Sequence, residues 1–236
     1  MRLHPLTVLF LFATFTGLSV SALVAWIATT PRWRDQRVIA LHLLTAAMFC
    51  LGLTPPTVLE APLGVLALAS SWNIGWGAAH YHAWLLVLAH TESRRLSRVE
   101  HIPLAVSLLF FVSSLVPGLL FDGATATFGT PVWGLLCRDL VPSTVGGLVV
   151  GAMIVAHLRT VSRFALAAWR GVPNARFFAV WSLGELILVA VDMLAVAHLL
   201  PTPYLSPLWL MAYQLAVAAM ITRRPARMAG AIVPSQ

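Results

Sequence analysis

The placement of the arginines constrains this chain more than any other feature of its sequence. Its 236 residues contain 15 arginines and no lysine, and the arginines gather between seven long apolar stretches. Basic residues close to the ends of membrane helices stay on the cytoplasmic side. Only Arg2 and Arg138 fall on one side of such a membrane. All the others fall on the opposite side, after the first, third, fifth and seventh stretches: Arg32, Arg34, Arg37, Arg94, Arg95, Arg98, Arg159, Arg163, Arg170, Arg176, Arg223, Arg224 and Arg227. The pattern predicts seven transmembrane helices with the N-terminus outside and the C-terminus in the cytoplasm.

The composition supports a membrane protein. Hydrophobic residues make up 59% of the chain and charged residues 10%, whereas a soluble domain is about 25% charged. A span needs about 20 apolar residues, so seven spans use nearly all of the chain. We therefore expect an all-α, multi-pass bundle in the bacterial inner membrane, comprising residues 1–222, and a short cytoplasmic tail, 223–236. The expected spans are 6–29, 38–59, 63–90, 103–121, 141–165, 177–200 and 204–222.

The net charge of +7 does not require a nucleic-acid partner. The arginines are spread over four edges and form no continuous patch, and attraction to anionic lipid of the inner leaflet explains their placement. We expect the lipid bilayer as one partner. A second, a cytoplasmic protein, would dock on the arginine-bearing link at 159–176 and on the tail at 223–236.

The segment from Asp122 to Leu140 is the longest one expected outside the membrane. Its glycines and prolines predict a turn-rich loop, which either rests on the lipid headgroups through Trp133 or closes a pocket as a lid. Cys137 in this loop and Cys50 are close enough in expected depth for a disulfide to be conceivable. Two isolated thiols without a spacing pattern are more typical of apolar filler residues.

Polar side chains inside the expected spans point to a binding site, because carboxylates in hydrocarbon are costly. Glu185 and Asp192 lie seven residues apart, which places both on one face of the sixth span. The third span presents a polar and aromatic face at helical spacing. The predicted ligand-binding residues are Asn73, Trp76, His80, Trp84, Glu185, Asp192, Tyr213 and Gln214. The alternative is that these groups only form hydrogen bonds between helices, which contribute about 0.6 kcal/mol each on average.

Several cofactor chemistries can be compared with the sequence. A retinal Schiff base requires a lysine amine, which the chain lacks. Seven-helix zinc hydrolases carry a histidine pair on the last helix, and the seventh span here has no histidine. Bis-histidine haem ligation stays open, with His42, His80 and His157 as candidate ligands. No nucleotide-binding or nucleophilic motif stands out, so no catalytic or metal-binding residue is assigned.

Three segments resemble parts of a known family. They are Gly75-Trp76-Gly77 with Ala83-Trp84-Leu85-Leu86 and Thr91-Glu92-Ser93-Arg94-Arg95, the stretch from Asp192 through Leu200 to Pro207, and Thr222-Arg223-Arg224. Their sequences are similar to the third, sixth and seventh helices of bacterial seven-helix sensor modules. These modules form the N-terminal membrane region of some histidine kinases and diguanylate cyclases. In that family the last arginines lead into an output domain. Here the sequence ends at Gln236, so the resemblance implies an output partner on another chain, a free-standing receptor or a subunit of a complex.

The resulting hypothesis is a membrane sensor that binds a small apolar or amphiphilic ligand and signals to a cytoplasmic partner. One alternative is an accessory subunit of a membrane complex that binds haem or a pigment. The other is a membrane enzyme that uses the carboxylate and histidine cluster for acid–base chemistry.

Overall fold

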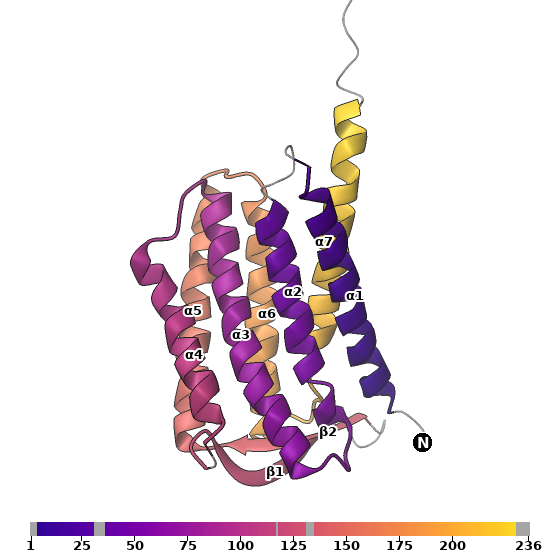
Figure 1. The fold of residues 1–236 in the computed structure, drawn as a ribbon, viewed down its shortest axis with the longest axis vertical. Helices are drawn as coiled ribbons and strands as arrows, with labels where there is room; N and C mark the ends of the chain where they lie inside the picture. The colour runs from indigo at the N-terminus through magenta and orange to yellow at the C-terminus, as the bar shows by residue number, and fades with distance from the viewer. Residues whose placement is uncertain (1–3, 31–35, 117, 131–134, 230–236) are drawn as a thin grey trace, which may run out of the picture.

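Helices aligned along one axis make up most of the molecule (Figure 1). The computed structural model describes residues 4–30, 36–116, 118–130 and 135–229. Within these ranges the α-helices are α1 (Pro5–Ile27), α2 (Arg37–Gly52), α3 (Leu63–Thr91), α4 (Ile102–Ser114), α5 (Thr144–Trp169), α6 (Ala175–Val196) and α7 (Ser206–Ala229). The expected helical bundle is confirmed.

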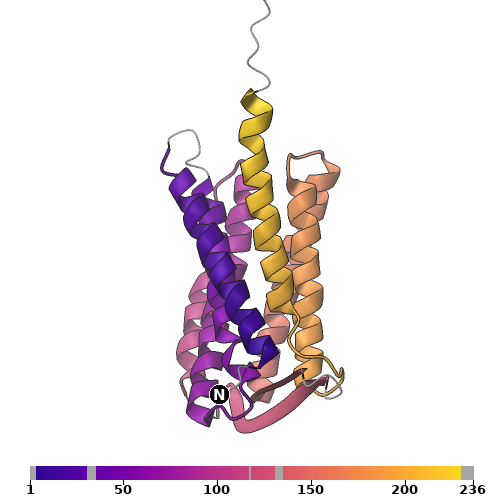
Figure 2. The same cartoon turned by 90° about the vertical axis from the view of Figure 1, so that its right-hand side faces the viewer.

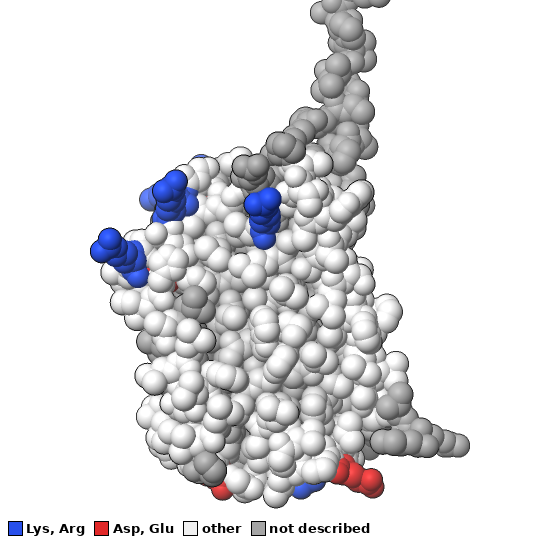
Figure 3. All heavy atoms as spheres, viewed as in Figure 1, with Lys and Arg blue, Asp and Glu red and all other residues white. Residues whose placement is uncertain are grey.

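Successive helices alternate in direction, so the start of α1 and the end of α7 lie at opposite ends of the bundle (Figures 1 and 2). In Figure 3, blue arginine side chains gather at the end where α7 terminates, which we call the arginine end. Acidic side chains appear at the opposite end, and an uncharged belt separates the two. This distribution fits a protein embedded in a membrane.

Four segments are long and apolar enough to cross a membrane: α1, Arg37–Thr57, α5 and α6. The apolar part of α7, Ser206–Ile221, is shorter, and α4 has only 13 residues. Helix α3 has 29 residues but is more polar, since it carries Asn73 and several histidines. A membrane protein is therefore supported directly by four helices.

Some helix ends differ from the predicted spans. Helix α2 ends at Gly52 and not at 59, because Pro55 and Pro56 lack backbone donors and form a separate 3₁₀ turn, η2 (Pro55–Thr57). Helix α4 ends at Ser114 and not at 121. Helix α7 continues through the expected boundary at 222 to Ala229, and residues 230–236 lie outside the described ranges.

The expected loop at 122–140 is largely a β-hairpin, so the all-α prediction was incomplete. Strands β1 (Phe121–Thr130) and β2 (Leu135–Pro142) pair antiparallel and cross the end of the bundle opposite the arginine end, which we call the hairpin end (Figure 1). Ala126 and Phe128 are buried while Thr127 between them is exposed. This period of two is the signature of a half-buried strand. The connection with Pro131 and Trp133 lies outside the described residues.

The largest core cluster surrounds Trp84, which is fully buried on α3. Side chains from α1, α2, α5, α6 and α7 pack into the same cluster: Val24, Leu43, Phe164, Phe178 and Val217. Phe164 is part of this core, and most of the link expected at 159–176 is helical, since α5 runs to Trp169 and α6 starts at Ala175. Cys50 and Cys137 are free and buried, which confirms that they act as apolar fillers.

Two contacts of α7 with other helices depend on glycine. The side-chain amide of Gln214 on α7 fills the space where a Cβ of Gly17 on α1 would lie. The ring of Trp209 on α7 occupies the corresponding space at Gly184 on α6. These contacts bring α7 close to both α1 and α6.

Candidate functional site

A cavity of about 180 Å³ lies between α3, α5 and α6. An engineered protein cavity of about 150 Å³ binds benzene, so this one has room for a single substituted aromatic ring. Asp139, Leu140 and Pro142 of β2 and Tyr204 in the link before α7 line it at the hairpin end. Most of its wall is apolar, with Ile74 from α3, Val149, Val150, Met153 and Ile154 from α5, and Leu186, Val189 and Met193 from α6.

The first polar group in the cavity wall is the pair of His80 on α3 and Glu185 on α6. His80 Nε2 lies 3.1 Å from Oε1 and 3.2 Å from Oε2 of the carboxylate, and Trp84 Nε1 donates to Oε2 over 2.8 Å. Both residues of the pair are buried. A buried carboxylate is tolerated when it is paired and hydrogen-bonded, and these contacts satisfy that condition.

Hydrogen bonding to Thr45 defines the orientation of the His80 ring. The Thr45 hydroxyl donates to the carbonyl of His42 over 2.8 Å, and its oxygen lies 3.0 Å from His80 Nδ1. The Thr45 hydroxyl and His80 Nδ1 are hydrogen-bonded to each other, with the donor set by the tautomer of His80. The opposite ring nitrogen, Nε2, faces the Glu185 carboxylate.

A second histidine connects this pair to α7. The ring of His42 on α2 lies 4.4 Å from the His80 ring, centroid to centroid, and Tyr213 Oη on α7 lies 3.2 Å from His42 Nδ1. The other ring nitrogen of His42 has no hydrogen-bond partner among the described residues. His42 does not line the cavity but lies directly behind it.

The second polar group, at the hairpin end, centres on Asp139 of β2. Its carboxylate accepts hydrogen bonds from Tyr204 Oη at 2.6 Å, Leu140 N at 2.8 Å and Ser70 Oγ at 3.0 Å. Burial raises the pKa of Asp139, and the bonds from Tyr204, Leu140 and Ser70 act in the opposite direction. Burial raises the pKa of Tyr204 well above its ordinary value, and the neighbouring Asp139 adds to that effect.

Asp192 on α6 is held at the start of α7. Its Oδ1 accepts from Leu205 N at 2.7 Å and its Oδ2 from Ser206 N at 3.1 Å. A carboxylate at a helix N-terminus satisfies free backbone donors and interacts favourably with the helix dipole. Asp192 therefore positions the first turn of α7 in addition to lining the cavity.

Four of the eight predicted ligand-binding residues line this cavity: Asn73, His80, Glu185 and Asp192. The remaining four are not among its lining residues. Trp84 supports Glu185 from behind, Tyr213 contacts His42, Trp76 packs near Trp72 with ring centroids 5.8 Å apart, and Gln214 packs on Gly17. Ligand binding by any of the eight stays a prediction.

Asp139 and Tyr204 were not among the residues predicted from the sequence. No sequence signal separates Asp139 from Asp122 in the same segment, because only the register of β2 decides which carboxylate faces inward. Tyr204 lies in a proline-rich link, where its direction depends on how α6 and α7 are joined.

Several ring nitrogens of the histidines considered for haem are already hydrogen-bonded. Both nitrogens of His80 have partners, and His157 Nε2 donates to the carbonyl of Ser182 over 3.1 Å. His42 Nε2 is buried without a partner among the described residues, and haem ligation by these residues stays a prediction. No group of three or more metal-ligating side chains occurs among the described residues.

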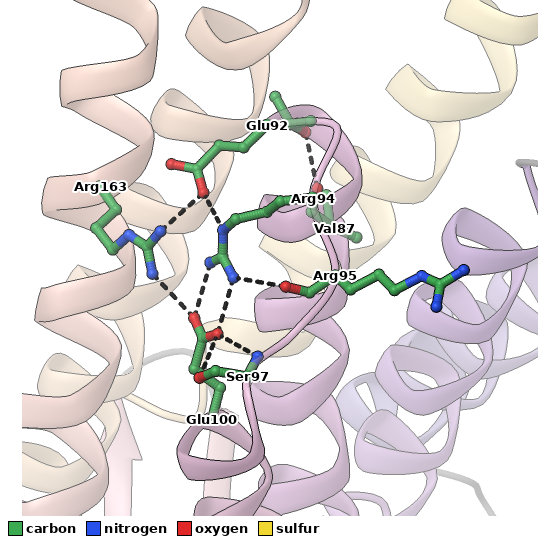
Figure 4. Close-up of polar contacts among 8 residues, drawn as sticks. Val87, Glu92, Arg94, Arg95, Ser97, Glu100 and Arg163 are labelled. Carbon is green, nitrogen blue, oxygen red and sulfur yellow. Dashed lines mark hydrogen bonds and ion pairs between the residues drawn. The ribbon is translucent and has the colours of Figure 1, made fainter.

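A cluster of ion pairs joins α3, η3 (Arg98–His101) and α5 near the arginine end (Figure 4). Arg94 donates to both oxygens of Glu100 over 2.8 and 2.7 Å, and its Nε donates to Glu92 over 2.6 Å. Arg163 on α5 binds the same two carboxylates at 3.0 and 2.8 Å. Of the predicted docking surface, Arg163 is thus already paired, and the side chains of Arg223 and Arg224 lie outside what the structure describes.

Comparison of the chain with protein-family models and with curated protein sequences finds no match in either set.

Proposed function

We propose that this chain is a membrane receptor module that binds a small, mainly apolar ligand in the cavity and transmits binding through α7. One observation carries the proposal. The residues that hold the first turn of α7 also form the cavity wall: Asp192, Tyr204 and Ser206. A ligand in contact with these side chains changes the interactions that position α7.

Transmission requires that the ligand bind one arrangement of α7 more tightly than another. Helix α7 suits this role because it starts at the cavity and projects beyond the other helices at the arginine end (Figure 2). The His80–His42–Tyr213 contacts give the cavity a second connection to α7, near the middle of that helix. A displacement of α7 at the cavity is thereby transmitted to the far end of this helix.

In this proposal all seven helices cross the bacterial inner membrane with α7 ending in the cytoplasm, where a partner protein receives the signal. The clustering of arginines at one end supports this orientation. The similarity to sensor modules of histidine kinases and diguanylate cyclases supports the same role.

The test combines a cavity-filling substitution with ligand-dependent stability. The purified protein is screened by thermal unfolding in detergent against small apolar and amphiphilic compounds, since a ligand of the folded state raises Tm. Val150→Phe fills the cavity and is expected to abolish the shift. The matched control, Leu148→Phe, changes a residue that is 70% exposed on the same helix and is expected to keep it. Ligand shifts that persist in Val150→Phe contradict the proposal.

The alternative of a pigment-binding or haem-binding subunit predicts a visible absorption band in the purified protein. A stoichiometric band that is lost on His42→Ala favours that alternative, because His42 Nε2 is a buried ring nitrogen without a hydrogen-bond partner among the described residues.

A further inference from the structure

Two carboxylates line the cavity at its hairpin end. Asp139 is 6% exposed and Asp192 is 3% exposed. Both are bound by the same short link, Asp139 through Tyr204 and Asp192 through Leu205 and Ser206. The link thus brings two acidic groups to one end of one cavity.

Neither carboxylate has a basic partner among the described residues. Every hydrogen bond to them comes from a hydroxyl or a backbone N–H, and no arginine lines the cavity. Arg138, adjacent to Asp139 in the sequence, instead donates to the carbonyls of Leu59 and Ala61. Buried carboxylates are normally paired with a cation, so this end of the cavity lacks a positive charge.

The carboxylate of the other polar group has a basic neighbour, since His80 Nε2 lies 3.1 Å from Glu185 Oε1. Among the residues that line the cavity, carboxylates without a basic partner are therefore confined to the hairpin end, and the wall between the two polar groups is apolar.

Ser206 supplies an independent indication of a ligand. Its side chain is 1% exposed and lines the cavity. The hydroxyl lies beside Asp192, yet Ser206 Oγ has no partner in hydrogen-bonding geometry among the described residues. It is available to accept a hydrogen bond from a ligand bound between the carboxylates.

From these features we infer that the ligand is a small organic cation, an amine with an apolar body about the size of one aromatic ring. Its ammonium group lies between Asp139 and Asp192 and donates to Ser206 Oγ, and its body lies against Ile74, Val150 and Val189. The inference rests on the proposed receptor function and adds the charge and size of the ligand.

A cationic ligand would also affect the position of α7 directly. An ammonium group competes with Leu205 N and Ser206 N for Asp192, and with Tyr204 Oη for Asp139. These are the bonds that hold the link and the first turn of α7. A neutral ligand of the same shape fills the cavity without competing for them.

The experiment uses three probes with one body and different headgroups: 2-phenylethylamine, 2-phenylethanol and phenylacetate. Their affinities for the purified full chain are measured by calorimetric titration at neutral pH. The amine is expected to bind at least about tenfold more tightly than the alcohol, since charge-assisted hydrogen bonds are about twice as strong as neutral ones. Phenylacetate is expected to bind most weakly because it meets two carboxylates.

Asn substitutions remove the charge and keep the shape. Asp139→Asn and Asp192→Asn are expected to lower amine affinity to about that of the alcohol, and a cooperative unfolding transition in detergent shows that each variant still folds. Asp122→Asn, at an exposed carboxylate of the same hairpin, is the matched control and is expected to bind the amine normally.

The outcomes separate this inference from the receptor proposal. If the alcohol or phenylacetate binds as tightly as the amine, and Val150→Phe blocks that binding, the cation assignment is wrong and the receptor proposal stands. Amine binding that survives both Asn substitutions also overturns the assignment. If none of the probes binds, the assignment of charge and size is wrong, and the compound screen with Val150→Phe then decides the receptor proposal on its own.

Discussion

Tyr204 donates its hydroxyl hydrogen to Asp139 at 2.6 Å, and this bond ties the hairpin to the link that leads into α7. Both side chains are buried, and they come from segments 65 residues apart. The same link is also bound to α6 through Asp192. The hairpin, α6 and the start of α7 therefore form one connected unit at the end of the cavity.

Tyr204→Phe removes the Tyr204–Asp139 hydrogen bond and leaves Asp139 with Ser70 and Leu140 as donors. Hydrogen bonds to charged groups contribute about 1.5–3 kcal/mol, so we expect the unfolding free energy to fall by about this amount. The measurement is unfolding of the purified protein in detergent. In the control, Tyr81→Phe, the lost bond runs to the neutral carbonyl of Ala156 at 3.2 Å, and a smaller loss is expected. An equal loss of unfolding free energy in the two variants would contradict this prediction.

Trp84→Phe is expected to destabilise the protein more than Trp72→Phe. Trp84 Nε1 donates to the Glu185 carboxylate and Trp72 Nε1 to the carbonyl of Met48, both over 2.8 Å. The two substitutions remove the same indole N–H, but only the first withdraws a donor from a buried carboxylate. Their Tm values in one detergent provide the comparison, although Trp84 is also the more buried ring. Adding Glu185→Gln separates the two effects, because it should reduce the difference if the carboxylate causes it.

Gly17→Ala places a methyl group where Gln214 packs against α1. Overpacking of a close contact costs about 1–3 kcal/mol, and we expect a loss of stability in that range. Gly147→Ala is the control, since nothing lies within 4 Å of a Cβ at that position and alanine favours helix. A stable Gly17→Ala variant would show that α1 and α7 are less tightly packed than described.

Acid is expected to destabilise the arginine end through Glu100. Arg94 donates two hydrogen bonds to Glu100 and holds its pKa well below the usual range. A lowered folded-state pKa gives stability that is fully present above the unfolded value, about 4.3 for Glu, and is lost as the pH falls through the lowered pKa. The free energy of unfolding, measured from neutral pH downward, should therefore fall more steeply in the wild type than in Glu100→Gln. Glu60→Gln, at an exposed position, should follow the wild type.

Reporter fusions test the orientation. A reporter fused after Gln236 is expected to be cytoplasmic, and one inserted in the exposed part of β1 at residues 122–124 is expected to be periplasmic. The same compartment for both fusions would indicate an even number of spans between the two positions and would contradict the prediction of three. A reversed result would contradict the interpretation of the arginine pattern.

The sequence by itself determined the helices, the belt between charged ends and part of the cavity wall, because these follow from local properties. An apolar run of sufficient length forms a helix in a membrane whatever its neighbours, and arginine placement is visible without a fold. The seven-residue spacing placed Glu185 and Asp192 on one face for the same reason.

Only the tertiary structure decided which polar groups meet. Gln214 was predicted to line the ligand site, but the rotation of α7 about its own axis directs it to Gly17 on α1. Asp139 reaches the cavity because β2 pairs with β1 in one register, and a shift by one residue would turn it to the opposite face. Helix rotation and strand register are set by packing between segments that are distant in the chain. A local sequence pattern therefore does not predict them.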